Sequence, residues 1–299
     1  MRRARVTYCG AYHHIMNRGI QGEKIFGDER AKQYFLKALE EKTRKLRISI
    51  LAYCIMNNHY HLIAQNTSGR LSDFMKQLNG QYGIYYRSMT KTKGYVFQNR
   101  YKSTLVQEDR YLKQVIIYAL LNPVRAAVVK DPYAYKWSSI GKYFTKEESF
   151  INAEEVEDIF ESKEKMREYM SVSSGAEDVE ITKTSIGSMI GDKEFIRRAE
   201  ELFNRRNRTK MSARKRVKDY IFIPAEEVIK EFERRKGINI EKINTSDRTG
   251  KKLRDELLIR LKDEAGLNYS EIIKIQIFRH LKYNSLGAIY NRAKKNVIL

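Results

Sequence analysis

Short runs of β-favouring residues recur early in the chain. The pair Asn57-Asn58 separates the last two of these runs, and such a pair is typical of a tight turn or bend. We therefore expect a strand, a turn and a second strand between residues 48 and 64. The runs are Tyr12–Met16, Ile48–Met56 and His59–Ala64.

Three further segments carry apolar side chains at helical spacing. The first opens at Asp28, and the last ends at Asn122-Pro123, where proline prevents easy continuation of a helix. Short strands mixed with helices of this length predict an α+β sandwich in which helices pack on one sheet. The segments are 28–46, 71–89 and 109–121.

The end of the chain has a helical and basic pattern with no strand-like run. We expect helices over 224–236 and 249–265, a third starting at Tyr269, and a last one over 283–295. Asn284-Ser285 suits the N-cap of the last helix. This pattern predicts an all-α domain over residues 213–299.

Charge is divided unevenly between these regions. Residues 1–150 carry 26 basic and 11 acidic side chains, a net +15, and residues 201–299 carry 25 and 13, a net +12. The stretch 151–200 has 7 basic and 13 acidic residues, a net −6. We expect an α+β domain over 1–150, a partly helical connector over 151–212 with the boundary near 150–180, and the helical domain after it.

The whole chain has 299 residues, a net charge of +21 and two cysteines. Two cysteines supply neither a disulfide framework nor a four-cysteine zinc site, so we expect a reduced, intracellular protein. No stretch approaches the roughly 18 apolar residues of a membrane-spanning helix. The excess of basic residues predicts a polyanionic partner, DNA or RNA, although Lys and Arg that merely solvate helices are the alternative.

His59 and His61 are the first candidates for chemistry. Side chains alternate along a strand, so these two imidazoles point to one face while Tyr60 points to the other. Two imidazoles are half of a metal site, and a third ligand is needed. Structural or exposed histidines are the alternative reading of an isolated His-x-His pair.

Tyr118 and Asn122 are the second candidates. Four residues apart, they lie on one helical face, so the hydroxyl and the amide can address one point in space. A packing tyrosine followed by an ordinary helix terminator explains the same spacing, and spacing alone favours that explanation.

Five blocks in order over about residues 5–145 resemble the IS200-like, REP-associated tyrosine transposase family. This resemblance implies a ferredoxin-like α+β fold of the HUH endonucleases, which cleave and rejoin single-stranded DNA through one tyrosine. The blocks are His14–Gly19 (HIMNRG), Ala52–Leu62 (AYCIMNNHYHL), Gly94–Ser103 (GYVFQNRYKS), Tyr118–Ala126 (YALLNPVRA) and Trp137–Ser139 (WSS).

By this resemblance His59 and His61 are metal ligands, Asn122 is the third ligand and Tyr118 is the nucleophile. Mg²⁺ or Mn²⁺ is the implied cofactor, with the nitrogen ligands slightly favouring Mn²⁺. A tyrosine hydroxyl has an ordinary pKa near 10, so a Lewis acid on the scissile phosphate would assist its attack. Tyr60 departs mildly from the family pattern, and Met56-Asn57-Asn58 stands where Met-Pro-Asn is typical.

The implied partner is single-stranded hairpin DNA, bound by a homodimer in the cytoplasm of a prokaryote, at its nucleoid. Cations with interleaved rings are suited to single strands. The candidate contacts in the first region are Arg2, Arg3, Arg5, His14, Arg18, Arg87, Arg100, Tyr101 and Lys102.

The final helical segment resembles the helix-turn-helix region of the C-terminal domain of the replication initiator DnaA. That resemblance implies binding of duplex DNA in the major groove through Ser285, Tyr290, Asn291 and Arg292. A small helical dimerisation or packing module is the alternative.

These features predict a DNA strand transferase that acts through a covalent 5′-phosphotyrosine. A catalytically idle DNA-binding regulator on the same fold and an RNA-hairpin binder are the alternatives, since basic and aromatic surfaces do not distinguish the sugars.

Overall fold

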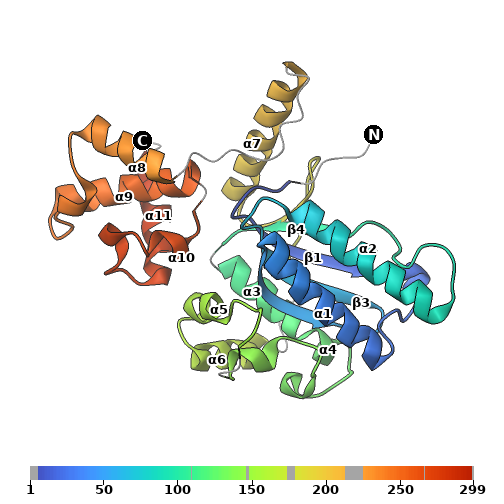
Figure 1. Ribbon diagram of the computed structural model, residues 1–299. Coiled ribbons are helices and arrows are strands. Elements are labelled where there is room, and N and C mark those ends of the chain that lie inside the picture. Colours follow the sequence, from blue (N-terminus) through green and yellow to red (C-terminus); the bar gives the residue numbers. More distant parts are fainter. Residues whose placement is uncertain are drawn as a thin grey trace. The chain divides into compact units, whose positions relative to one another are not determined.

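The computed structural model describes residues 6–108, 110–145, 148–173, 179–212, 225–265 and 267–297. The chain forms two compact units, Met1–Asp219 and Tyr220–Leu299. The first unit is built on a β-sheet, and the described part of the second is helical (Figure 1).

The sheet of the first unit has the predicted ferredoxin-like order. Strands and helices follow as β1-α1-β2-β3-α2-β4, and the four strands lie antiparallel in the order β2-β3-β1-β4. The elements are β1 (Tyr12–Arg18), α1 (Glu29–Leu46), β2 (Ser49–Ile55), β3 (His59–Gln65), α2 (Leu71–Thr90) and β4 (Lys102–Val106).

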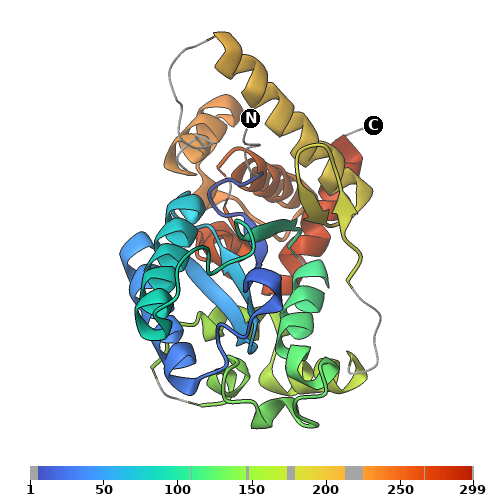
Figure 2. The same cartoon turned by 90° about the vertical axis from the view of Figure 1, so that its right-hand side faces the viewer.

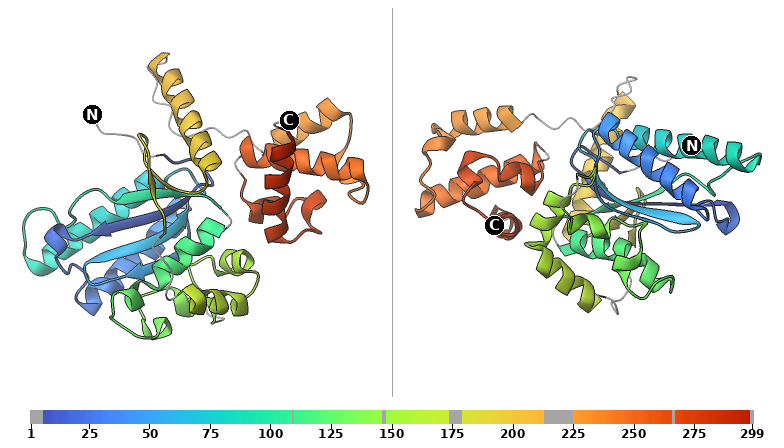
Figure 3. Two further views of the ribbon diagram at one scale, coloured as in Figure 1. Left: turned by 180° about the vertical axis from the view of Figure 1, so that it is seen from behind. Right: turned by 60° about the horizontal axis from the view of Figure 1, so that its bottom comes forward.

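The sheet lies between two layers of helices. Helices α1 and α2 cover one face, and α3 (Arg110–Leu120) lies on the other, as the side view in Figure 2 and the right panel of Figure 3 show. Under α1 and α2 the rings of Phe26, Phe35, Tyr60 and Tyr82 pack together with centroids 4.7 to 6.1 Å apart. Burial of these rings holds the helical layer to the sheet.

Local signals set the ends of these elements. Asp28 caps α1, its carboxylate accepting a hydrogen bond from the Arg30 N–H (2.8 Å), as its position in the sequence predicted. After α3 the chain turns into α4 (Asn122–Arg125), with Pro123 in its first turn. Short 3-10 turns complete the region at Ile20–Gly22, Pro132–Ala134 and Ile140–Tyr143.

The division of the chain comes later than the expected boundary near 150–180. Residues expected to connect two domains instead extend the sheet to six strands, because β6 pairs in parallel with β4 and β5 pairs with β6. Met189 and Ile190 of β6 are buried, so two apolar side chains anchor this otherwise polar stretch. The added elements are α5 (Ala153–Phe160), α6 (Lys163–Ser173), β5 (Thr182–Lys183), β6 (Ser188–Ile190) and α7 (Lys193–Ser212).

The second unit packs its helices around Leu257, Leu258, Phe278 and Leu286, all fully buried. A reciprocal capping box between Asn268 and Glu271 starts its third helix. Its helices are α8 (Ala225–Lys236), α9 (Arg248–Asp263), α10 (Tyr269–Ile272) and α11 (Tyr283–Val297), with 3-10 turns at Ile240–Lys242 and Gln276–Phe278.

The expected N-cap of the last helix was wrong. Helix α11 begins at Tyr283, so Asn284 and Ser285 lie within its first turn. Tyr283 and Leu286 are buried, and their burial favours a helix that begins one residue before Asn284. None of the helices in the described ranges is both long and apolar enough to cross a lipid bilayer.

Candidate active site

Strand β3 places both candidate histidines on the face of the sheet opposite α1 and α2. His59 pairs with Arg18 and His61 with Met16 across β1, which puts all four side chains on one face. Tyr60 points to the other face, where it is fully buried and its hydroxyl donates to Asn79 Oδ1 (2.8 Å). This partner on α2 explains how a tyrosine is accommodated between the two histidines.

Helix α3 brings Tyr118 over the same face. The helix contacts β2 and β3, and the half-buried Tyr118 ring lies edge-on to two imidazoles. Its centroid is 5.9 Å from that of His61 and 5.9 Å from that of His14. The guanidinium carbon of Arg125 lies 5.0 Å from the Tyr118 ring centroid. A histidine pair and a cation therefore surround the candidate nucleophile.

Asn122 stands where the chain turns from α3 into α4, one helical turn after Tyr118. Its Oδ1 lies 3.4 Å from Nε2 of His59. The amide of Asn122 and the imidazole of His59 thus meet in space although 63 residues separate them.

The proton on His59 is set by its other neighbour. Asn58 Nδ2 donates to the Gly22 carbonyl (3.4 Å), which leaves Asn58 Oδ1 as the acceptor facing His59 Nδ1 at 2.6 Å. In the neutral imidazole Nδ1 then carries the proton, and Nε2 turns its lone pair toward Asn122 Oδ1. Burial lowers the pKa of His59 further than its contact with Asn122 raises it, which favours this neutral form.

His61 is buried and held by a third histidine. Nδ1 of His61 lies 2.8 Å from Nε2 of His14, and the two rings stack with centroids 5.1 Å apart. Burial, with His14 and His59 close by, holds the pKa of His61 well below its ordinary value, and burial lowers the pKa of His14 to about 4. Both imidazoles are therefore neutral near pH 7, the form in which imidazole binds metals.

The donor set fits a divalent cation. His59 Nε2 and Asn122 Oδ1 lie 3.4 Å apart, near the roughly 3 Å that separates adjacent ligands of a six-coordinate ion with bonds of about 2.1 Å. Within the described residues no group of three His, Cys, Asp or Glu side chains could hold a metal. Any ion here would therefore depend on the amide of Asn122 as well as on the imidazoles.

The expected DNA contacts of the first unit do not all lie on this face: Arg18 and Lys102 do, whereas Arg87 is on α2, which covers the other face. Arg18, Arg100 and Lys102 are exposed, and half-buried Arg87 donates to the Gly94 carbonyl (3.4 Å). The His14 side chain is hydrogen-bonded to His61. Tyr101 is only 8% exposed, which removes its ring from the surface available for stacking. Arg2, Arg3 and Arg5 lie outside the described residues.

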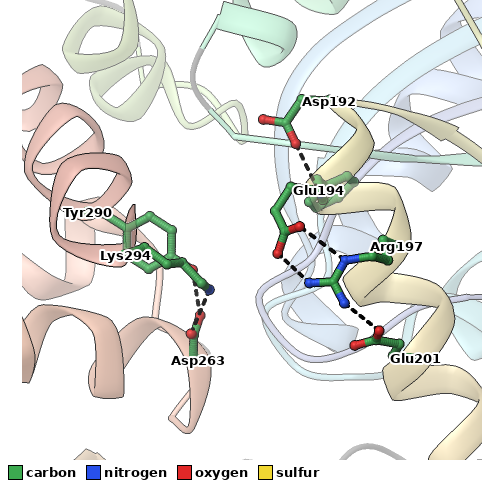
Figure 4. Close-up of polar contacts among 8 residues, drawn as sticks. Asp192, Glu194, Arg197, Glu201, Asp263, Tyr290 and Lys294 are labelled. Atoms are coloured by element: carbon green, nitrogen blue, oxygen red, sulfur yellow. Dashed lines mark hydrogen bonds and ion pairs between the residues drawn. The ribbon is translucent and has the colours of Figure 1, made fainter. Parts of the chain in front are cut away.

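The expected contacts of the second unit lie on α11. Asn291 and Arg292 are exposed and Ser285 is half-buried. The Tyr290 hydroxyl donates to Asp263 Oδ1 (2.6 Å), and Lys294 Nζ approaches both groups, as the close-up in Figure 4 shows. Tyr290 therefore links α11 to α9. Of the four expected DNA contacts on α11, the exposed ones are Asn291 and Arg292.

Arg125 is the site residue that sequence reasoning missed. It lies seven residues after Tyr118, a spacing that returns to the same helical face after two turns. The intervening Pro123 obscured that signal, because it predicts a break in the helix at this point. In the structure the turn at Pro123 is short, and Arg125 still reaches the Tyr118 ring.

Comparison with known proteins gives one family match and two similar structures. Residues 7–119 match the family of IS200-like transposases. The structure of a REP-associated tyrosine transposase bound to a REP hairpin shares 17% identity, with a TM-score of 0.41 over 49% of this chain and 85% of that one. A structure from Deinococcus radiodurans R1, described as that of a transposase candidate, shares 18% identity, with a TM-score of 0.29 over 43% and 92%. No curated protein matches significantly. The part of the chain that matches the IS200-like transposase family holds β1 to β4 and Tyr118.

Proposed function

We propose that the first unit is a metal-dependent endonuclease and strand transferase acting on single-stranded hairpin DNA. One observation carries the proposal: His59 Nε2 lies 3.4 Å from Asn122 Oδ1, beside a tyrosine whose ring lies edge-on to His61. With the His59 proton on Nδ1, the lone pair of Nε2 and the Asn122 oxygen are both available to a cation. The match of residues 7–119 to a transposase family supports DNA as the substrate.

In the proposed reaction Tyr118 is the nucleophile. Its oxygen forms a bond to phosphorus and loses its proton, while the bond to the 3′-oxygen breaks and that oxygen leaves as a 3′-hydroxyl. The product is a 5′-phosphotyrosine, which keeps the phosphodiester energy. Attack by another 3′-hydroxyl reverses the step and joins two strands without a further energy source.

His59, His61 and Asn122 would hold the divalent ion, Mg²⁺ or Mn²⁺. When bound, such an ion polarises the phosphoryl oxygens and offsets the charge that builds up on them. Asn58 and His14 keep the two imidazoles in the required tautomers through their hydrogen bonds. Arg125, beside the Tyr118 ring, adds a positive charge where the phenolate and the phosphate meet.

The remaining charge suits the rest of such a substrate. Arg18 and Lys102, exposed on the same face of the sheet as His59, would contact phosphates next to the cleaved bond. We further propose that the protein acts as a homodimer, and that Asn291 and Arg292 on α11 contact duplex DNA.

The covalent adduct tests the proposal. With Mn²⁺ and a hairpin labelled in the tail 3′ of the cut, which is the fragment that stays bonded to Tyr118, the wild-type protein should form a labelled adduct that survives denaturing electrophoresis, and EDTA should prevent it. Tyr118→Phe should form none while still binding the hairpin. Tyr111→Phe is the matched control, because it removes a half-buried hydroxyl from the same helix.

Two outcomes would overturn the proposal: an undiminished adduct with Tyr118→Phe, or no metal-dependent cleavage of any DNA hairpin by the wild type. An RNA hairpin of the same sequence separates the rival reading. Cleavage of DNA alone supports the transferase, whereas tight binding of RNA without cleavage of either strand supports an RNA-binding protein.

A further inference from the structure

The loop between α2 and β4 is held firmly at the end of β1. The Ile20 N–H donates to the Val96 carbonyl (3.0 Å), and the Gln98 N–H donates to the Arg18 carbonyl (3.0 Å). Phe97 forms a β-bridge with Gly19, and its ring lies 6.0 Å from that of Tyr82 in the core. The backbone of this loop is therefore fixed on both sides of its β-bridge.

Tyr95 stands out from that fixed backbone. It is 85% exposed, more than any other large apolar or aromatic side chain within the described ranges, while Val96 beside it is buried. Gly94 allows the turn before it with φ of 101°, a conformation that side chains rarely adopt. An aromatic ring presented on an ordered backbone loses little conformational entropy when a flat ligand stacks on it.

The sequence around Tyr95 is rich in positive charge. The sequence contains no acidic residue between Asp73 and Glu108 and six basic ones. Lys91, Lys93 and Arg100 are exposed within the loop itself. A ring among cations is the combination that binds a base and its flanking phosphates in a single strand.

The loop lies close to the proposed site of cleavage. Arg18 pairs with His59 on one side of β1 and receives the Gln98 hydrogen bond on the other. With strands about 4.8 Å apart and about 3.3 Å per residue along a strand, the Tyr95 backbone lies roughly 15 Å from that of His59. A few nucleotides of extended DNA cover this distance.

We propose that Tyr95 is a stacking platform for one unpaired base of the DNA strand that enters the active site. Lys93 and Arg100 contact the phosphates of the same segment. The base must be unpaired and unstacked, because in a duplex its faces are covered by neighbouring pairs. The proposal rests on the function proposed above, and it assigns to Tyr95 the aromatic role that the sequence had indicated for Tyr101, whose ring is buried.

Binding of two DNA hairpins tests this assignment. One carries a single-stranded tail on the side that is cleaved and the other has no tail, and both are titrated by fluorescence anisotropy against Tyr118→Phe protein, which cannot cut them. Adding Tyr95→Ala should weaken binding of the tailed hairpin about 10-fold and leave the tailless hairpin unchanged. Tyr95→Phe should bind like its parent, because stacking needs the ring and not the hydroxyl.

Tyr133→Ala, added to the same parent, is the matched control, since it removes another exposed tyrosine of the first unit. An abasic nucleotide moved along the tail then locates the contact. At one position it should weaken the parent about 10-fold and have no further effect on Tyr95→Ala. Equal loss with both hairpins, no loss with the tailed one, or the same loss with Tyr133→Ala would overturn the assignment.

Failure of the two proposals can be told apart. If wild-type protein forms the Tyr118 adduct but Tyr95→Ala binds the tailed hairpin normally, only the stacking platform is wrong. If wild-type protein forms no adduct with any tailed hairpin, the proposed function itself fails.

Discussion

Nε2 of His14 lies 2.8 Å from Nδ1 of His61, a contact between neighbouring strands that joins a third histidine to the His-x-His pair. When His61 Nδ1 carries the proton and donates it to His14, His61 Nε2 keeps the lone pair that a metal requires. A partner that orients a ligand in this way commonly changes metal affinity 10- to 100-fold. His14 is therefore a positioning residue in the proposed site.

Replacing His14 should weaken metal binding before it affects the fold. For His14→Ala we expect Mn²⁺ affinity, measured by isothermal titration calorimetry without DNA, to fall about 10-fold. His14→Gln, which keeps an acceptor near the same place, should restore much of it. The control is His280→Ala, an exposed histidine of the second unit. Unchanged Mn²⁺ affinity in His14→Ala would remove the positioning role.

The buried hydroxyl of Tyr60 should matter for stability and not for chemistry. Tyr60→Phe leaves Asn79 Oδ1 without its donor, so we expect a loss of about 1 kcal/mol in the free energy of unfolding. Urea denaturation followed through Trp137 fluorescence measures it, with Tyr133→Phe as an exposed control. A double variant with Asn79→Ala should lose less than the sum of the two single changes. Full additivity would show that the contact contributes nothing.

The shifted pKa of Lys262, in the second unit, should make the free energy of unfolding depend on pH above 7. Burial lowers the pKa of Lys262 to about 7, against an ordinary value near 10.5. Because the unfolded chain binds this proton more tightly, the free energy of unfolding should rise as the pH increases from about 7 to about 10.5. NMR of ¹³C-labelled lysine should show one ammonium titrating near pH 7, and that signal should vanish in Lys262→Met. A lysine spectrum with every midpoint near 10 would contradict this expectation.

Binding of duplex DNA through α11 should depend on the salt concentration. Arg292→Ala should weaken duplex binding by the full chain and reduce the slope of log K against log salt by about 1, as loss of one phosphate contact requires. Arg235→Ala on α8 is the control, because its side chain is 65% exposed and that of Arg292 is 67% exposed. Equal slopes for Arg292→Ala and the wild type would exclude a phosphate contact at this position.

Local periodicity accounts for the parts of the site that could be predicted from sequence. Alternation along a strand places His59 and His61 on one face of that strand. Helical spacing places Tyr118 and Asn122 on one face of a helix. In both cases backbone geometry alone sets the direction of the side chains. The ferredoxin-like order followed from the family resemblance and is confirmed by the antiparallel order of the four strands.

Contacts between distant segments could not be predicted in the same way. The boundary near 150–180 was placed from charge and composition, yet the buried side chains of Met189 and Ile190 carry residues 188–190 onto the edge of the sheet. Tyr95 and Tyr101 lie in one block with the same kind of neighbours, and only packing decides that the first ring is exposed and the second buried.

The sequence by itself determined which side chains share a face of each strand or helix, since that depends on a few bonds of backbone. Only the tertiary structure decided which faces meet. The register of β1 against β3 brings His14 to His61, and the packing of α3 on the sheet brings Asn122 to His59. These contacts depend on the burial of apolar surface summed over many residues, so no short stretch of the chain encodes them.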